Sequence, residues 1–265
     1  MKIRILAALL IAMLCAIGRA EEKKELTVFA AASLTESFKE LGKSFEEKHP
    51  GVKVTFNFGA SNMLRTQLEQ GAKAEVFASA NTKEMETAIK SALITADASR
   101  TFARNRLVVL IPKANRAKLE AVKDLAKPGI KLVIGNKAVP VGKYALEMLD
   151  KMSADPAFGD KFKETVLKNV VSEEESVKAV VSKVRLDEAD AGIAYVSDIG
   201  AAAKDVNALE IAAKFNPIAT YPVAPLAKSA EPALAKEFVE LLLSPAGQET
   251  LQKFGFMAAD EKKKD

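Results

Sequence analysis

Short apolar runs alternate regularly with amphipathic segments along this chain, and this alternation limits the folds that it can adopt. Strands are predicted at 26–30, 52–58, 76–78, 107–111, 132–135, 170–171 and 191–195. Between the strands, apolar residues recur at helical spacing, and Phe38, Leu41 and Phe45 form one such face. Strand–helix–strand repetition with apolar strands is typical of an α/β fold in which helices flank mostly parallel sheets.

The number of strands favours two lobes over one. Seven or more strands in the 245 residues after residue 20 fit two sheets better than a single sheet. We expect lobe I at 21–103 plus 221–259 and lobe II at 104–220, with crossings near 103–105 and 220–222. The run of charged residues at 260–265 predicts a solvated, disordered tail.

The first twenty residues predict a secretory signal peptide. Lys2 and Arg4 precede an apolar run over 5–17, and small residues then lead to a predicted cut after Ala20. The apolar run is shorter than the roughly 20 residues of a membrane span. An uncleaved membrane anchor and a lipoprotein acylated at Cys15 are the alternatives. The prediction is a periplasmic protein.

Charge and composition exclude several classes of function. The signal peptide holds three of the 39 Lys+Arg and none of the 35 Asp+Glu, so its removal changes the net charge from +4 to +1. Nucleic-acid binding needs clustered basic residues, so no such partner is expected. The chain has one cysteine and one histidine, which rules out a disulfide framework and a Cys-rich zinc site.

Motifs of enzyme chemistry are absent from the sequence. Neither a G-x-S-x-G elbow nor a G-x-G-x-x-G loop occurs. His49 stands at a predicted helix end, where it is best explained as an exposed residue near the helix dipole. The acidic run 173–175 is predicted to open a helix near 174–185 as solvated charges rather than as a cation site. We therefore predict no catalytic residue, no cofactor and no side-chain metal ligand.

Two helix starts, each carrying a serine, are the strongest candidates for a binding site. Ser33 and Ser61 each follow a strand that ends in small residues. Helix N-termini carry unpaired N–H groups and positive partial charge, so two of them aimed at one crevice can hold an anion. The alternatives are structural: Ser33 with Glu36 can form a capping box, and Ser61 can be a plain N-cap. Val177 lies on an apolar face of a predicted helix, and this periodicity predicts that it is a core residue.

Several segments in order resemble the periplasmic molybdate-binding proteins of ABC transporters. The first two contain Ser33 and Ser61, and later ones contain Val141 and Tyr195. The matching segments are 28–35, 58–64, 67–72, 76–80, 139–145, 192–198, 221–223 and 255–256. The resemblance covers nearly all of residues 26–257. The first segment alone is a weak signal, whereas the whole ordered set is specific.

The resemblance implies two α/β lobes, joined by two crossing segments, that close on an oxyanion in the cleft between them. At matching positions it implies ligand contacts from the hydroxyls of Ser33 and Ser61, the backbone N–H groups of Val141 and Val177, and the Tyr195 hydroxyl. Val141 stands where relatives often carry alanine, a change that keeps the backbone donor. Molybdenum would be bound as the oxyanion, without side-chain coordination.

The implied function is a non-enzymatic, monomeric receptor. It captures molybdate or tungstate and delivers it to an inner-membrane ABC permease. Three alternatives stay open at this point: a receptor for another oxyanion such as sulfate or a phosphonate, a secreted α/β hydrolase or transferase, and a scaffold without a ligand. The hydrolase needs a nucleophile–base pair, for which only His49, carboxylates or lysines are available.

Overall fold

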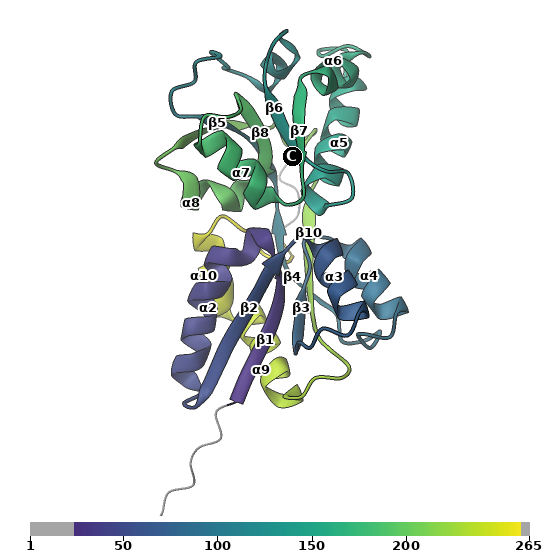
Figure 1. Cartoon of the computed structure of the whole chain (residues 1–265), viewed down its shortest axis with the longest axis vertical. Helices are drawn as coiled ribbons and strands as arrows, with labels where there is room; N and C mark the ends of the chain where they lie inside the picture. The colour runs from purple at the N-terminus through teal and green to yellow at the C-terminus, as the bar shows by residue number, and fades with distance from the viewer. Residues whose placement is uncertain (1–23, 261–265) are drawn as a thin grey trace, which may run out of the picture.

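The computed structural model describes residues 24–260 and shows two α/β lobes, one above the other in Figure 1. The predicted signal peptide and residues 261–265 of the predicted tail lie outside the described residues. The strands of the first sheet, in spatial order, are β2 (Val52–Gly59), β1 (Lys24–Ala31), β3 (Val76–Ala78), β10 (Ala219–Pro225) and β4 (Arg100–Asn105). Those of the second are β7 (Val170–Glu174), β6 (Leu132–Gly135), β8 (Ala191–Tyr195), β5 (Leu107–Pro112) and β9 (Val206–Glu210).

Both sheets have the same mixed plan. In the first, β1 pairs in parallel with β2 and β3, while β10 runs antiparallel to β3 and β4. In the second, β6 pairs in parallel with β7 and β8, while β5 runs antiparallel to β8 and β9. Four of the five strands in each sheet therefore point the same way. The predicted fold class, two lobes with mostly parallel sheets, is confirmed.

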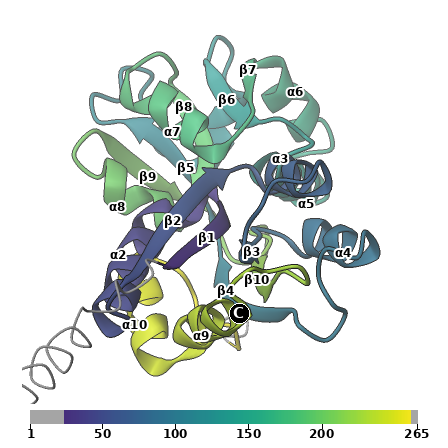
Figure 2. The ribbon, with the colours of Figure 1, turned by 60° about the horizontal axis from the view of Figure 1, so that its bottom comes forward.

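Helices cover both faces of each sheet (Figures 1 and 2). Those of the first lobe are α2 (Thr35–Lys48), α3 (Ser61–Glu69), α4 (Thr82–Lys90), α9 (Pro232–Leu243) and α10 (Pro245–Lys253). Those of the second are α5 (Pro140–Ser153), α6 (Phe162–Lys168), α7 (Val177–Arg185) and α8 (Ile199–Ala202). Short 3₁₀ turns are η1 (Ala32–Leu34), η2 (Val122–Ala126) and η3 (Val196–Asp198).

The alternation of side chains along β1 explains why this strand is covered on both sides. Val28 and Ala30 belong to the core under α2 and α9, whereas Phe29 packs in a separate cluster with Leu64 of α3 and Met85 of α4. Successive side chains of a strand point to opposite faces, so a strand buried on both faces is apolar throughout. β1 is therefore fixed between two helical layers, and its carboxyl end is a rigid support for η1.

The two crossing segments lie side by side. The chain passes from the first sheet to the second between Asn105 and Leu107, and it returns along β10, where Ala219 pairs with Asn105 and Tyr221 with Ala103. The predicted lobe boundaries, at 103/104 and 220/221, fall inside this β4–β10 pair and stay a prediction. Within residues 24–260, none of the helices combines the length and apolar character that crossing a bilayer requires.

One sequence expectation needs correction in the second lobe, and one strand there lies outside the sequence predictions. The acidic run at 173–175 does not open a helix: β7 extends to Glu174, and α7 begins at Val177 with Ser176 as its N-cap. Strand β9 was not predicted, because most of its side chains are exposed and its sequence lacks an apolar run. β9 lies at the edge of its sheet, so only β5 contributes a strand neighbour.

Candidate functional site

The carboxyl ends of three parallel strands from each lobe surround one cavity. In open α/β sheets this edge is where ligands bind. The lining residues all follow or end those six strands: Ala31, Ala32, Ser33, Gly59, Ala60, Ser61, Ala80, Val139, Pro140, Val141, Ser176, Val177 and Tyr195. The cavity therefore lies between the lobes, and all five residues that the sequence singled out are part of its wall.

The cavity is small and its wall carries no charged side chain among the described residues. Its volume is about 20 Å³, counted as the space open to the centre of a water-sized sphere. One water molecule needs roughly 10–15 Å³ on this measure. The space fits a ligand of a few atoms rather than a sugar or an amino acid.

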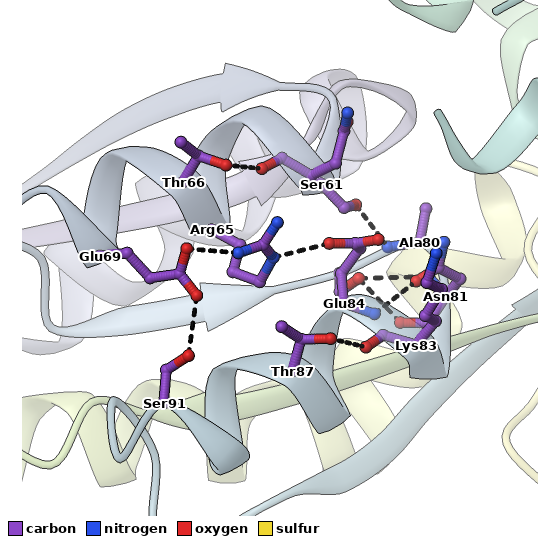
Figure 3. Close-up of polar contacts among 12 residues, drawn as sticks. Ser61, Arg65, Thr66, Glu69, Ala80, Asn81, Lys83, Glu84, Thr87 and Ser91 are labelled. Carbon is purple, nitrogen blue, oxygen red and sulfur yellow. Dashed lines mark hydrogen bonds and ion pairs between the residues drawn. The ribbon is translucent and has the colours of Figure 1, made fainter. Parts of the chain in front are cut away.

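The Ser61 hydroxyl accepts a backbone hydrogen bond, and its own hydrogen has no acceptor within residues 24–260. Ser61 is the first residue of α3 and is 1% exposed, and its Oγ accepts a hydrogen bond from the Ala80 N–H at 3.0 Å. Figure 3 shows the Ser61 side chain directed at the Ala80 amide. A hydroxyl that accepts a backbone bond keeps its own hydrogen for another partner. Its side chain does not cap α3, so the plain N-cap alternative is wrong.

Ser33 has a different partner. It lies in η1 and is 5% exposed, and its Oγ is 2.9 Å from the hydroxyl of Tyr221 on β10. The residue at the N-cap of α2 is Leu34, and no side chain forms a capping bond there. The capping-box alternative for Ser33 is therefore wrong, and the Ser33 hydroxyl serves the cavity wall instead.

Val141 and Val177 line the cavity from the second lobe, where each stands at the start of a helix. Val141 is the second residue of α5, after Pro140, and Val177 is the first residue of α7. The first N–H groups of a helix have no acceptor within the helix. Both side chains are buried, at 2% and 5% exposure. Val177 is therefore both a core residue, as predicted, and part of the cavity wall.

The start of α5 approaches the end of β6 closely at Gly142. A Cβ at this position would overlap the carbonyl oxygens of Gly135 and Asn136. Only glycine allows the helix to begin this near the strand. The Val141 N–H is thus placed by a backbone contact that a larger residue would open.

Tyr195 supplies the clearest hydrogen-bond donor that lacks an acceptor within the described residues. It ends β8, it is 1% exposed, and its hydroxyl has no hydrogen-bond partner within residues 24–260. Burial raises the pKa of Tyr195 well above its usual value, and the nearby Tyr221, Tyr144 and Asp198 act in the same direction. The phenol is therefore neutral and protonated. A buried polar atom without a partner is costly, and because Tyr195 lines the cavity, a ligand bound there would satisfy its hydroxyl.

A buried ion pair lies behind the second-lobe wall. Asp198 in η3 is fully buried and accepts the backbone N–H of Tyr195 at 3.2 Å. Its other carboxylate oxygen is 3.2 Å from the ammonium of Lys178, the residue after Val177. Burial raises the pKa of the Asp198 carboxyl, and Lys178 opposes that rise. This lysine is engaged by Asp198, so the cavity is left with neutral donors.

Helices α3 and α4 are tied together beside Ser61 (Figure 3). Arg65 of α3 binds Glu84 of α4 at 2.7 Å, and Glu84 is only 5% exposed. Asn81 caps α4, with its Oδ1 accepting the Glu84 N–H at 2.9 Å. The cap and the ion pair together fix α4, and with it the Ala80 amide that holds Ser61.

Replacing this cap gives a local test. Asn81→Ala is expected to lower the free energy of unfolding by about 1 kcal/mol, because the N-cap bond is lost. Urea denaturation of both proteins measures the difference. Thr87→Ala in the same helix is the control and is expected to stay within about 0.5 kcal/mol of the parent. Equal stability of Asn81→Ala and Thr87→Ala would contradict the capping role.

The polar groups of this wall can donate hydrogen bonds, and none of its side chains is a base that could take up a proton. The wall offers three hydroxyls, from Ser33, Ser61 and Tyr195, and the N-termini of helices from both lobes. His49 follows α2, and the 14 residues of this helix make it about 21 Å long, so His49 lies too far from Ser33 to serve it as a base. In the described part of the chain, His, Cys, Asp and Glu form no group of three or more that could hold a metal. The fold and site define a two-lobe binding protein for a small anion.

Comparisons with known proteins agree with this class. The family model described as bacterial extracellular solute-binding protein matches residues 26–257. The molybdate-binding protein ModA of Mycobacterium tuberculosis H37Rv is 35% identical over 239 residues, which are 90% of this chain and 87% of that protein. The chain belongs to the bacterial extracellular solute-binding protein family, whose members bind solutes and are not enzymes. The predicted family and the prediction of a non-enzyme are thus confirmed.

Solved structures give the same fold. The substrate-binding domain of a putative molybdenum ABC transporter from Clostridium difficile is 31% identical, with a TM-score of 0.66, and the match covers 88% of this chain and 98% of that one. The sulfate-binding protein SubI of Mycobacterium tuberculosis has a TM-score of 0.80 at 17% identity, covering 89% and 88% of the two chains. That likeness shows the fold alone.

Proposed function

We propose that this protein is the periplasmic receptor of an ABC transporter and that it captures molybdate, or the similar tungstate, in the interlobe cavity. The ligand contacts are the hydroxyls of Ser33, Ser61 and Tyr195 and the N–H groups of Val141 and Val177. The receptor acts as a monomer and delivers the anion to an inner-membrane permease. The relatives named molybdate-binding supply the choice of metal.

The observation that carries the proposal is a small cavity lined by hydroxyl and N–H donors without a charged side chain. Such a wall suits a dianion that has lost all its protons. Phosphate near neutral pH keeps a proton that needs an acceptor, and the wall offers no carboxylate. Sulfate is the competing ligand, because it is also fully deprotonated. Discrimination between molybdate and sulfate then depends on the size of the cavity.

The number of donors is enough for tight binding. A hydrogen bond to a charged group contributes about 1.5–3 kcal/mol. Five such bonds exceed the roughly 8 kcal/mol of a micromolar complex at the middle of that range, before the cost of closing the lobes is subtracted. No lysine or arginine is needed at the site, which agrees with the near-neutral charge expected for the mature chain.

A panel of anions tests the proposal. Molybdate at a hundredfold excess over its dissociation constant is expected to stabilise the protein by about 2.7 kcal/mol, measured as a shift of the thermal transition. Tungstate is expected to act similarly, sulfate less, and phosphate least. A shift with sulfate but none with molybdate would reassign the ligand. The absence of any shift with all four anions would overturn the proposed function.

A further inference from the structure

The Ser61 hydroxyl is held from outside its own helix. Its Oγ accepts the Ala80 N–H at 3.0 Å, and in the described part of the chain no side chain caps α3. A backbone N–H can only donate, so the direction of this bond is fixed. The orientation of Ser61 in the cavity wall therefore depends on what holds the peptide that carries the Ala80 N–H.

That peptide lies in a short turn, residues 79–81, between β3 and α4. At the first residue of the turn, the Ser79 N–H donates to the Pro222 carbonyl of β10 at 2.9 Å. At its last residue, Asn81 caps α4, which anchors the turn to that helix (Figure 3). Ala80 stands between these two anchors, so the backbone on both sides of it is bonded to a neighbouring element.

The Ser79 side chain closes this turn. Its Oγ donates to the Asn81 carbonyl at 2.8 Å and accepts the Asn81 N–H at 3.2 Å. Both partners are backbone groups with a single role, so the direction of each bond is fixed. Ser79 is 0% exposed and is not among the residues that line the cavity. Because its one hydroxyl hydrogen is already used, Ser79 has none to offer to a ligand, and its hydroxyl acts on the backbone around Ala80.

We propose that Ser79 is a positioning residue for anion binding: its hydroxyl braces the turn so that the Ala80 N–H keeps the Ser61 hydroxyl in the cavity wall as a hydrogen-bond donor. The order of contacts is Ser79, the backbone of the turn, Ser61 and then the ligand. A hydroxyl whose oxygen already accepts a hydrogen bond has its own hydrogen available for a second partner. The inference rests on the proposed function, because it needs an oxyanion in the cavity.

The brace connects Ser61 to the middle of the first sheet. The turn continues β3, whose three residues are all 0% exposed and which lies between β1 and β10 in the sheet. The other cavity serine, Ser33, lies in η1 and is bonded to the Tyr221 hydroxyl, so it does not depend on this turn. Loss of the Ser79 hydroxyl is therefore expected to loosen the bond from Ala80 to Ser61 and to leave Ser33 unchanged.

Amide hydrogen exchange tests the brace without any ligand. The Ala80 amide is expected to exchange at least about threefold faster in Ser79→Ala than in the parent, because its bond to Ser61 opens more often. NMR of the ligand-free proteins measures this rate. Ser37→Ala is the matched control, because Ser37 is 1% exposed and donates to the Leu34 carbonyl at 3.1 Å, away from the turn. This control also loses a buried hydrogen bond, yet its Ala80 rate should stay within about twofold of the parent.

A double-mutant cycle connects the brace to binding. Ser79→Ala is expected to raise the dissociation constant for molybdate about threefold to tenfold, the value of one neutral hydrogen bond. If Ser79 acts through Ser61, the same substitution has no further effect in a Ser61→Ala background and keeps its full effect in a Ser33→Ala background. A general loosening of the lobe would weaken binding equally in both backgrounds. Titration calorimetry of the single and double variants measures the cycle.

The outcomes distinguish this inference from the proposed function. The parent protein is titrated with molybdate first, and no binding there overturns the proposed function itself. Where the parent binds, an unchanged Ala80 exchange rate or an unchanged molybdate constant in Ser79→Ala overturns the inference alone, and so does a loss that persists in the Ser61→Ala background. Ser79→Cys is used if Ser79→Ala does not fold. It nearly keeps the side-chain volume, and its weaker hydrogen bonds predict smaller changes with the same dependence on Ser61.

Discussion

Replacing both cavity serines, Ser33→Ala with Ser61→Ala, is expected to raise the dissociation constant for molybdate by at least about 100-fold. In the proposed site each hydroxyl donates to a charged ligand, and such a bond contributes about 1.5–3 kcal/mol, or roughly a factor of 10 to 150. The two serines contact one ligand, so their effects need not add. Titration calorimetry of the two single variants and the double variant measures the loss.

The matched control for this prediction is Ser37→Ala. Ser37 is 1% exposed, lies in α2 one turn after Ser33, and donates to the Leu34 carbonyl at 3.1 Å. It is a buried serine outside the cavity wall, so the same chemical change should leave the molybdate constant within about twofold. A loss in Ser37→Ala equal to that of the single cavity variants would mean that the effect is structural.

Stability changes can be separated from binding at Ser61. Alanine at this position leaves the Ala80 N–H without its acceptor, which costs about 1–3 kcal/mol when the group stays buried. Urea denaturation without ligand gives that cost directly. The binding prediction concerns the affinity of the folded protein, and an unchanged constant in Ser61→Ala would remove Ser61 from the site.

The strands and helices found from the sequence are those with strong local patterns. The predicted strands at 76–78, 132–135 and 191–195 coincide with β3, β6 and β8, and the predicted helical face of Phe38, Leu41 and Phe45 lies on α2. Helix α4 was not predicted, although Asn81 and Glu84 at its start give an N-cap signal that could have found it. Strand β9 carries no such signal, because its pairing with β5 rather than its own sequence makes it a strand.

The site residues also divide into those with a local sequence signal and those without one. Hydroxyl residues at helix starts are visible in a sequence, and they pointed to Ser33 and Ser61 on physical grounds. Val141 and Val177 are proposed to act through backbone N–H groups, which almost any residue type provides, so only the family resemblance could indicate them. The structure brings all five residues to one cavity, and their contact with an anion stays a prediction.

The partners of the two serines were beyond the reach of sequence patterns. Ser33 and Tyr221 are 188 positions apart, and they meet because β10 returns from the second lobe to pair in the first sheet. Ala80 reaches Ser61 through a backbone N–H, which any residue except proline provides. The hydrogen-bond partner of each serine is thus a property of the assembled fold.

Lys178→Met is expected to lower the free energy of unfolding by about 3–5 kcal/mol at pH 8, because it leaves the buried Asp198 carboxylate without its counter-charge. Urea denaturation of parent and variant measures the deficit. Lys236→Met is the control. Lys236 is 76% exposed and 3.8 Å from Glu240, so its loss should cost at most about 0.5 kcal/mol.

The deficit of Lys178→Met should shrink as the pH falls. The pKa of Asp198 is raised in the folded protein, and losing Lys178 raises it further. A carboxyl with a raised folded pKa favours the folded state fully below its unfolded pKa of about 3.9, and that contribution is lost as pH rises through the folded value. Measurements at pH 5, 6.5 and 8 should therefore show a growing deficit. A constant deficit would contradict the buried-charge explanation.

A second substitution distinguishes the charge from the packing of the lysine. Lys178→Met with Asp198→Asn removes both charges and is expected to recover most of the lost stability, because the buried group is then neutral. The molybdate constant of the double variant should stay within about threefold of the parent. Lys178 follows a cavity residue yet is bound to Asp198, so a large loss of affinity would show that a positive charge, rather than neutral donors, holds the anion.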